Sequence, residues 1–202
     1  MDTRILVLNM RTPYKGNGIM INTCSNSNVE WQSDLSPFKL GPIDLYDGFQ
    51  AMRHENAWQY SKVYKLHTDA DGNPTDEYWK WATEGWSNQK AVRYPMGRGA
   101  KPEYAIWAGR KLGYVDARKQ IYSPLYIKLV TETGAYEELQ YMYKRATAEK
   151  PLVFRDFDGY DHVKLGMSLT EVLNDPKRKM GHAFLLKMLI TNDEALKQID
   201  YE

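Results

Sequence analysis

The segment with the clearest chemical potential is residues 55–62, Glu-Asn-Ala-Trp-Gln-Tyr-Ser-Lys. On a helix, residues three, four and seven apart lie on one face. One stripe would therefore carry a carboxylate, an indole, an amide and an ammonium group: Glu55, Trp58, Gln59 and Lys62. This set suits the wall of a cleft, with Glu55 as catalytic carboxylate, Trp58 as stacking surface and Lys62 as anion contact. A solvated face is the alternative, because charged helical stripes usually face water.

A second candidate segment is residues 93–102, Arg-Tyr-Pro-Met-Gly-Arg-Gly-Ala-Lys-Pro. Its two glycines alternate with basic residues directly before Pro102, which suits the first turn of a helix. Glycines let backbone N–H groups converge on an anion, and a helix amino terminus adds partial positive charge. Arg98 and Lys101 are therefore candidate phosphate contacts. The spacing matches neither a P-loop nor a dinucleotide fingerprint, so an ordinary surface turn is an equal alternative.

Residues 107–122 contain a second acidic candidate. Asp116 either caps a helix or serves as a second active-site carboxylate, kept ionised by Arg110 or Arg118. Trp107 offers a further ring on which a planar base could stack.

The acidic segment 156–162, Asp-Phe-Asp-Gly-Tyr-Asp-His, follows an expected strand. It matches no defined metal-ligand spacing, and a tight Asp-Gly turn is the favoured interpretation. A metal-free role for Asp158 in a cleft is the second interpretation, and a metal site is the third. We expect neither a metal nor another cofactor.

Composition excludes several classes of protein. The formal net charge of the 202 residues is +1, from 27 basic and 26 acidic side chains, which argues against a surface that binds polyanions generally. The single cysteine, Cys24, excludes an internal disulfide and a cysteine zinc cage, and it fits a reducing compartment. The apolar runs are too short for a signal peptide or a membrane span, so we expect a cytoplasmic protein. The 15 Tyr, 6 Trp and 5 Phe suit a pocket, an interface or a core.

The pattern of expected strands and helices predicts that one helix-rich α+β domain over residues 1–202 positions these side chains. Strands and loops are expected in 1–45, and mainly helices in 46–202. Two apolar runs, 4–10 and 18–23, flank a Lys-Gly-Asn-Gly turn, which predicts a small antiparallel hairpin. Spacing and breakers predict helices over 49–65, 76–85, 102–110, 115–150 (one or two), 169–174 and 180–190, and a strand over 151–155.

The order of these segments resembles the NADAR (NAD and ADP-ribose associated) superfamily, also called the YbiA-like fold. The residues that carry the resemblance are Asp34-Leu-Ser-Pro-Phe38, the Glu55, Trp58, Gln59 and Lys62 stripe, Gly109-Arg110, Asp116-Ala-Arg118 and Met180-Gly-His-Ala-Phe-Leu-Leu186. The chain departs from the family pattern in having Trp58 where Phe is more usual, and in lacking the usual Trp beside the second acidic residue.

The resemblance implies a hydrolase that cleaves an N-glycosidic bond of a phosphorylated ribosyl or ADP-ribosyl nucleobase. Such cleavage passes through an oxocarbenium-like state, which a carboxylate stabilises. The expected partner is a phosphorylated nucleoside or an ADP-ribosylated base; nucleic acid is possible, and a membrane is not expected. Two alternatives stay open: a non-catalytic nucleotide-binding or sequestering protein, and an enzyme that modifies a base in nucleic acid. The oligomeric state is open.

The resemblance and the chemistry of the side chains together imply the following role for each residue. Glu55 is the principal carboxylate and Asp116 its possible partner. Either Trp58 or Trp107 stacks the base. The phosphate contacts are Lys62, Arg98, Lys101 and Arg110.

Overall fold

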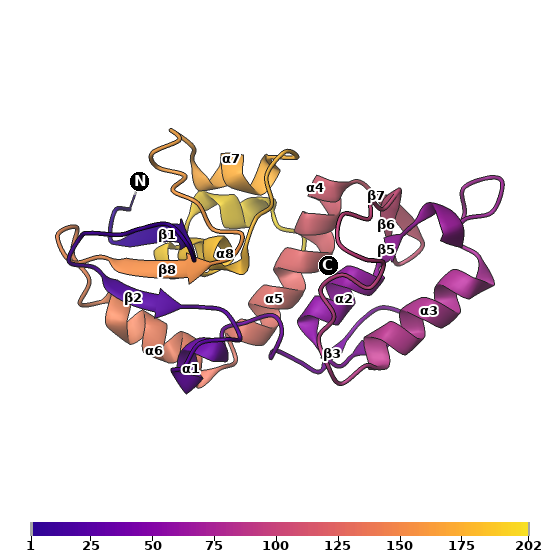
Figure 1. Ribbon diagram of the computed structural model, residues 1–202, viewed down its shortest axis with the longest axis horizontal. Helices are drawn as coiled ribbons and strands as arrows, with labels where there is room; N and C mark the ends of the chain where they lie inside the picture. The colour runs from indigo at the N-terminus through magenta and orange to yellow at the C-terminus, as the bar shows by residue number, and fades with distance from the viewer. Residues whose placement is uncertain (1, 202) are drawn as a thin grey trace.

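Strand β8 (Leu152–Asp156) is the centre of a three-stranded sheet in one lobe of the molecule (Figure 1). The computed structural model describes residues 2–201. Strands β1 (Ile5–Asn9) and β2 (Ile19–Asn22) lie on either side of β8, and both run parallel to it. The predicted antiparallel hairpin is therefore wrong. Its two strands each pair with β8, whose first three residues are fully buried, as in parallel sheets covered on both faces.

Helices cover this sheet and complete the first lobe. Helix α8 packs against β1 and β8, and α6 and α7 pack against α8. The helices of this lobe are α1 (Glu30–Ser33), α6 (Gly134–Tyr143), α7 (Leu169–Asn174), α8 (His182–Thr191) and the 3-10 helix η3 (Glu194–Gln198). The side chains of α8 that face the sheet are buried because the helix is apolar along most of its length.

The second lobe is built on α2 and α3. Its elements are β3 (Ile43–Asp44), β4 (Gln50–Ala51), α2 (His54–Tyr60), β5 (Lys62–Val63), η1 (Lys65–His67), α3 (Asp76–Ser87), β6 (Tyr104–Trp107) and β7 (Arg110–Leu112). Its core contains the fully buried rings of Tyr78 and Trp86. At Gly85 a Cβ atom would lie 2.0 Å from the Tyr60 ring, so only glycine lets α3 approach α2 this closely.

The segment expected to be a helix over 102–110 is instead the hairpin of β6 and β7. Trp107 pairs with Arg110 across a two-residue turn, Ala108–Gly109, in which both residues have positive φ. This conformation is the one that two-residue hairpin loops require, and Gly109 adopts it without strain. The long helix expected over 49–65 is also shorter, because β4 and β5 flank the seven residues of α2.

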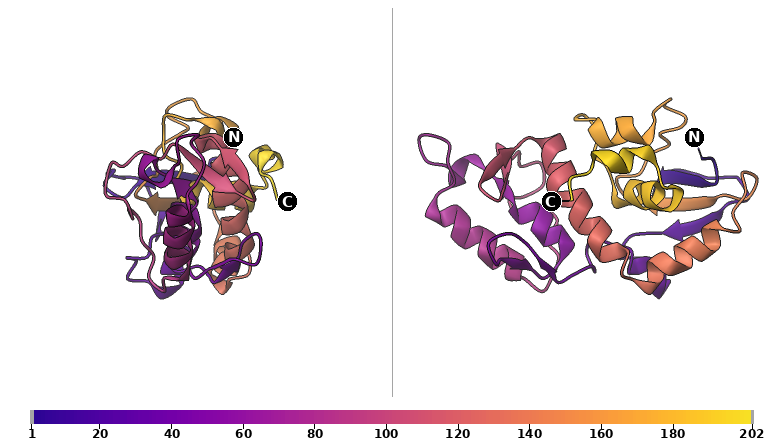
Figure 2. Two further views of the ribbon diagram at one scale, coloured as in Figure 1. Left: turned by 90° about the vertical axis from the view of Figure 1, so that its right-hand side faces the viewer. Right: turned by 180° about the vertical axis from the view of Figure 1, so that it is seen from behind.

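A continuous helical segment connects the lobes. It comprises α4 (Tyr114–Ala117), the π-helical turn η2 (Arg118–Tyr122) and α5 (Ser123–Val130). The view from behind shows α5 running between the two lobes (Figure 2). Each lobe has its own cluster of buried hydrophobic side chains. Trp58 and Leu129 pack against both clusters, so the two cores are in contact. The predicted α+β domain is confirmed, as are its helices near 76–85, 169–174 and 180–190 and its strand near 151–155.

No helix within residues 2–201 is both long enough and apolar enough to cross a membrane.

Candidate functional site

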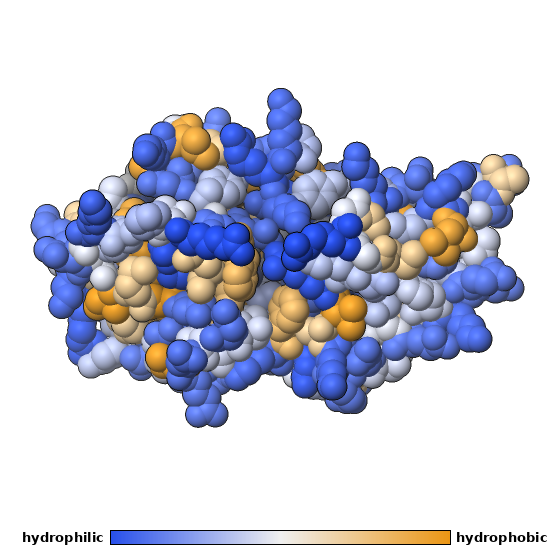
Figure 3. All heavy atoms as spheres, in the orientation of Figure 1, coloured by the Kyte–Doolittle hydropathy of each residue, from blue (hydrophilic) through white to orange (hydrophobic). Residues whose placement is uncertain are grey.

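A cleft of about 410 Å³ lies where the two lobes meet. The second lobe contributes α2, β5 and the loop over residues 93–102. The first lobe contributes the loops that follow β2, α1 and β8 and the turn that precedes α8. In the space-filling view, hydrophilic side chains border the junction of the lobes (Figure 3). The volume is in the range of small-molecule sites, which often lie between lobes.

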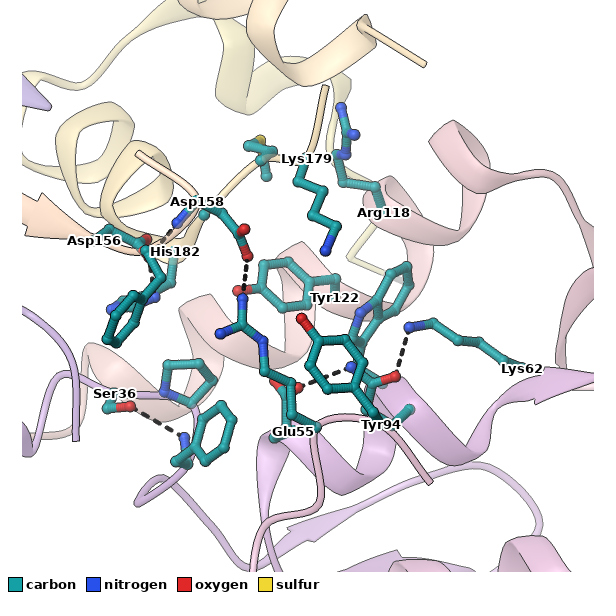
Figure 4. Close-up of a pocket in the computed structure, with 18 of the residues that line it drawn as sticks. Ser36, Glu55, Lys62, Tyr94, Arg118, Tyr122, Asp156, Asp158, Lys179 and His182 are labelled. Atoms are coloured by element: carbon teal, nitrogen blue, oxygen red, sulfur yellow. Dashed lines mark hydrogen bonds and ion pairs between the residues drawn. The ribbon is translucent and has the colours of Figure 1, made fainter. Parts of the chain in front are cut away.

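Helix α2 holds a buried carboxylate at this cleft. Glu55 is 5% exposed, and Gln59 Nε2 donates to its Oε1 at 2.8 Å. Lys62 Nζ in turn donates to Gln59 Oε1 at 2.7 Å (Figure 4). Because an ammonium group only donates, the amide oxygen of Gln59 must face Lys62 and its NH₂ must face Glu55. The sequence prediction of a shared face is confirmed, although Lys62 already belongs to β5.

Burial sets the protonation of this Glu55–Gln59–Lys62 relay. Removal from water raises the pKa of Glu55 from 4.5 to about 7, while Gln59, Lys62 and Arg93 act in the opposite direction. Burial also lowers the pKa of Lys62, against the attraction of Glu55. A carboxyl group that titrates near neutral pH can accept and release a proton during a reaction.

Aromatic rings surround the relay. The Phe, Tyr and Trp rings that line the cleft are Phe38, Trp58, Tyr64, Tyr94, Tyr114, Tyr122 and Phe157. Lys62 Nζ lies 4.5 Å from the centre of the Trp58 ring. Tyr94 and Phe157 are partly exposed, at 36% and 42%, although both line the cleft. Exposed ring faces of this kind suit a planar ligand, because stacking buries apolar area on both partners.

An ion pair joins the two lobes across the cleft. Arg93, from the loop over 93–102, donates to Asp158 Oδ2 at 2.7 Å, and both side chains are about 30% exposed. Asp158 follows β8, so the structure places this predicted residue in the cleft. Residues 156–159 also make the expected Asp-Gly turn, with Gly159 N–H donating to the Asp156 carbonyl.

Asp156 and His182 form a buried pair on the same side of the cleft. His182 Nε2 lies 2.7 Å from the Thr23 carbonyl oxygen, which only accepts, so Nε2 carries a proton. His182 Nδ1 lies 3.2 Å from Asp156 Oδ2, so the two side chains form an ion pair whenever the imidazole is protonated. The Ala183 N–H also donates to Oδ2 at the amino terminus of α8, where negative charge is favoured.

Five predicted residues do not meet this cleft. Asp116, Arg98, Lys101 and Arg110 are exposed and do not line it, and Trp107 is buried in the second core, 4.8 Å from the Tyr46 ring centre. The reason is local. The segment that contains Trp107 and Arg110 forms a hairpin instead of a helix, and Asp116 lies in the first turn of α4, where a carboxylate is stabilised by the helix dipole.

Arg118 lines the cleft but is engaged elsewhere. Its Nη1 donates to the carbonyls of Val172, Leu173 and Asp175, and its Nη2 donates to the carbonyl of Arg178. The guanidinium points away from the cleft centre (Figure 4). It therefore satisfies the last carbonyls of α7, which have no partner within the helix. Arg118 stabilises the fold instead of contacting a phosphate.

Sequence reasoning missed Arg93, Lys179 and Asp156. Arg93 lay inside a segment singled out for its other basic residues, and Asp156 inside the acidic segment. Lys179 belongs to the run Lys177-Arg178-Lys179, whose spacing does not indicate which side chain faces a cleft.

Neither a metal cluster nor an activated thiol is found in the described part of the chain. Within residues 2–201 no three or more His, Cys, Asp and Glu side chains are grouped to hold a metal ion. Cys24 lines the cleft, but burial raises the pKa of its thiol to about 12, which leaves it neutral and weakly nucleophilic.

Comparison with family models, curated proteins and solved structures found no match to this chain. The chemistry of the cleft is therefore inferred from its own residues.

Proposed function

We propose that this protein is a divergent member of the NADAR superfamily that hydrolyses an N-glycosidic bond in a phosphorylated ribosyl or ADP-ribosyl nucleobase. The observation that carries the proposal is Glu55, a carboxyl group only 5% exposed that nevertheless lines a ligand-sized cleft. It lies beside aromatic rings that suit a base and ammonium groups that suit a phosphate.

Glu55 acts in its ionised form. The bond between C1′ and the base nitrogen breaks, its electron pair leaves with the base, and positive charge develops at C1′. The nearby carboxylate stabilises this charge and takes a proton from the attacking water, whose oxygen bonds to C1′; Glu55 then gives that proton to the base nitrogen, which returns the carboxylate to its ionised form. The products are a free base and a ribosyl phosphate with a new C1′ hydroxyl. A positioned base of this kind contributes about 10² to 10⁴ in rate.

Gln59 and Lys62 orient the reacting carboxylate. The Gln59 NH₂ group holds Oε1, which fixes the rotamer of Glu55 on α2. Lys62 fixes the amide of Gln59, so the relay leaves Glu55 Oε2 for water or C1′. Trp58 and Tyr94 supply stacking surface for the leaving base.

One observation favours a second candidate, a protein that binds a nucleotide without cleaving it. Burial keeps Glu55 partly protonated near neutral pH, and the other two carboxylates in the cleft are already paired, Asp156 with His182 and Asp158 with Arg93. A cleft with little free negative charge binds an anionic nucleotide well and stabilises a carbocation less.

Mass spectrometry of a substrate panel separates the two. ADP-ribosylated guanosine, NAD and phosphoribosylamino-pyrimidines are incubated with the parent, with Glu55→Gln and with the exposed control Glu138→Gln. We expect the parent and the control to release free base or amine, and Glu55→Gln to be at least about 100-fold slower while still binding. Intact ligand recovered with all three would favour the binding protein, and parental turnover by Glu55→Gln would exclude Glu55 as the catalytic group.

A further inference from the structure

Among residues 2–201, four lysine and arginine side chains line the cleft, and two of them, Lys62 and Lys179, form no ion pair. Arg93 pairs with Asp158, and Arg118 donates to the carbonyls that follow α7. Within residues 2–201, Lys62 and Lys179 form no ion pair with a carboxylate: Asp156 and Asp158 are paired elsewhere, and Glu55 accepts from Gln59.

The ammonium groups of Lys62 and Lys179 both lie at the cleft beside aromatic rings. Lys179 immediately precedes the turn into α8, and Figure 4 shows its amino group pointing into the cleft, toward the Tyr94 ring whose centre is 5.7 Å away. Lys62 lies over Trp58. Lys179 also lowers the pKa of Lys62, so the two positive charges repel each other across the cleft. An anion between them would remove this repulsion.

We propose that Lys62 and Lys179 form the phosphate subsite of the cleft, and this inference rests on the proposed function. Each ammonium has three donors, so Lys62 can keep its bond to Gln59 and still donate to a phosphate oxygen. Lys179 donates to no acceptor within residues 2–201, so its three N–H groups can all donate to the ligand. A phosphate bound here would place an attached ribose beside the relay that ends at Glu55, with the Trp58 and Tyr94 rings flanking it.

Two ligands offer this chemistry: the terminal phosphate of a ribosyl phosphate, and the pyrophosphate of ADP-ribose. We measure binding of ribose 5-phosphate, ADP-ribose and unphosphorylated ribose by calorimetry. The proteins are the parent, Lys179→Met and Lys177→Met, the last removing the same charge two residues away from an exposed side chain that does not line the cleft. Thermal unfolding of each variant checks that it is folded.

We expect Lys179→Met to lower the affinity for the tighter-binding phosphorylated ligand by about tenfold or more, because a charge-assisted contact is lost. Lys177→Met should bind like the parent, and ribose should not distinguish the variants. The ligand that loses more affinity identifies the source of the phosphate. Lys62→Met should weaken binding too, and it should also shift the pH dependence of Glu55 because Gln59 loses its partner.

Equal affinities of Lys179→Met and Lys177→Met would overturn the subsite, as would a parent that binds neither phosphorylated ligand at millimolar concentration. Failure of the subsite and failure of the proposed function are distinguishable. Binding that depends on Lys179 without any base release would leave the subsite and remove the glycosidase. If Lys179→Met releases base with the parental rate and KM, the glycosidase is kept and the subsite is removed.

Discussion

The substitution Gly181→Ala tests how tightly the carboxylate of Asp156 is held at the start of α8. A Cβ atom at position 181 would lie 2.1 Å from Asp156 Oδ2, more than 1 Å inside ordinary contact distance, and the carboxylate must move. Oδ2 would then lose the Ala183 N–H and the His182 imidazole, each now 3.2 Å away. Overpacking together with a lost charged hydrogen bond costs about 2–4 kcal/mol. For a chain of this length that lowers Tm by roughly 5 to 15 °C.

Differential scanning calorimetry measures this loss, with Gly134→Ala as the matched control. Gly134 begins α6, and a Cβ atom added there would have no neighbour within 4 Å, so alanine should leave Tm unchanged or raise it slightly. In an Asp156→Ala background the carboxylate is gone, so adding Gly181→Ala should cost little more. A Tm for Gly181→Ala within about 1 °C of the parent, or an equal loss in both backgrounds, would refute the contact we describe.

Three further outcomes follow from the structure. Burial raises the pKa of Glu55 above its unfolded value of 4.5, so the stability that its protonated form contributes is fully present below pH 4.5 and is lost as pH rises through about 7. Base release needs the ionised carboxylate, so its rate should increase over the same pH range. Urea unfolding should show the first trend and a pH–rate profile the second, and Glu55→Gln should flatten the dependence of stability on pH. Arg118→Met leaves the buried carbonyls of Val172 and Leu173 without donors, so urea unfolding should show a loss of about 2–4 kcal/mol; parental stability would contradict this role. Trp107→Phe should lower stability by about 1–3 kcal/mol and leave ligand affinity unchanged, and calorimetry that shows weaker binding would return Trp107 to the cleft.

The sequence predicted correctly those features that depend on residues close together in the chain. The contact between Glu55 and Gln59 was predictable because residues four apart on a helix lie on one face, whereas Lys62, in β5, reaches Gln59 from beyond the end of the helix. Helix α7 was also predictable from its own residues, because Ser168 and Glu171 form a capping box at its start.

The remaining parts of the site depend on distant partners. The run 102–110 resembles a helix because Pro102 suits a first turn, yet Tyr104 and Ala105 of this run pair with β5, a strand far earlier in the chain. Lys177 and Lys179 have identical chemistry, and only the docking of α8 under Asp156 decides that Lys179 faces the cleft.

Because β8 lies between β1 and β2, the first twenty-two residues cannot complete their sheet until residues 152–156 have been synthesised. The buried strand residues Ile5, Val7 and Ile21 are exposed on the growing chain until then. Such long-range parallel pairing makes folding slow and favours late closure of the first lobe. The hydrophobic core of the second lobe is built from residues between Ile43 and Leu125, so it can assemble during translation before β8 has been synthesised.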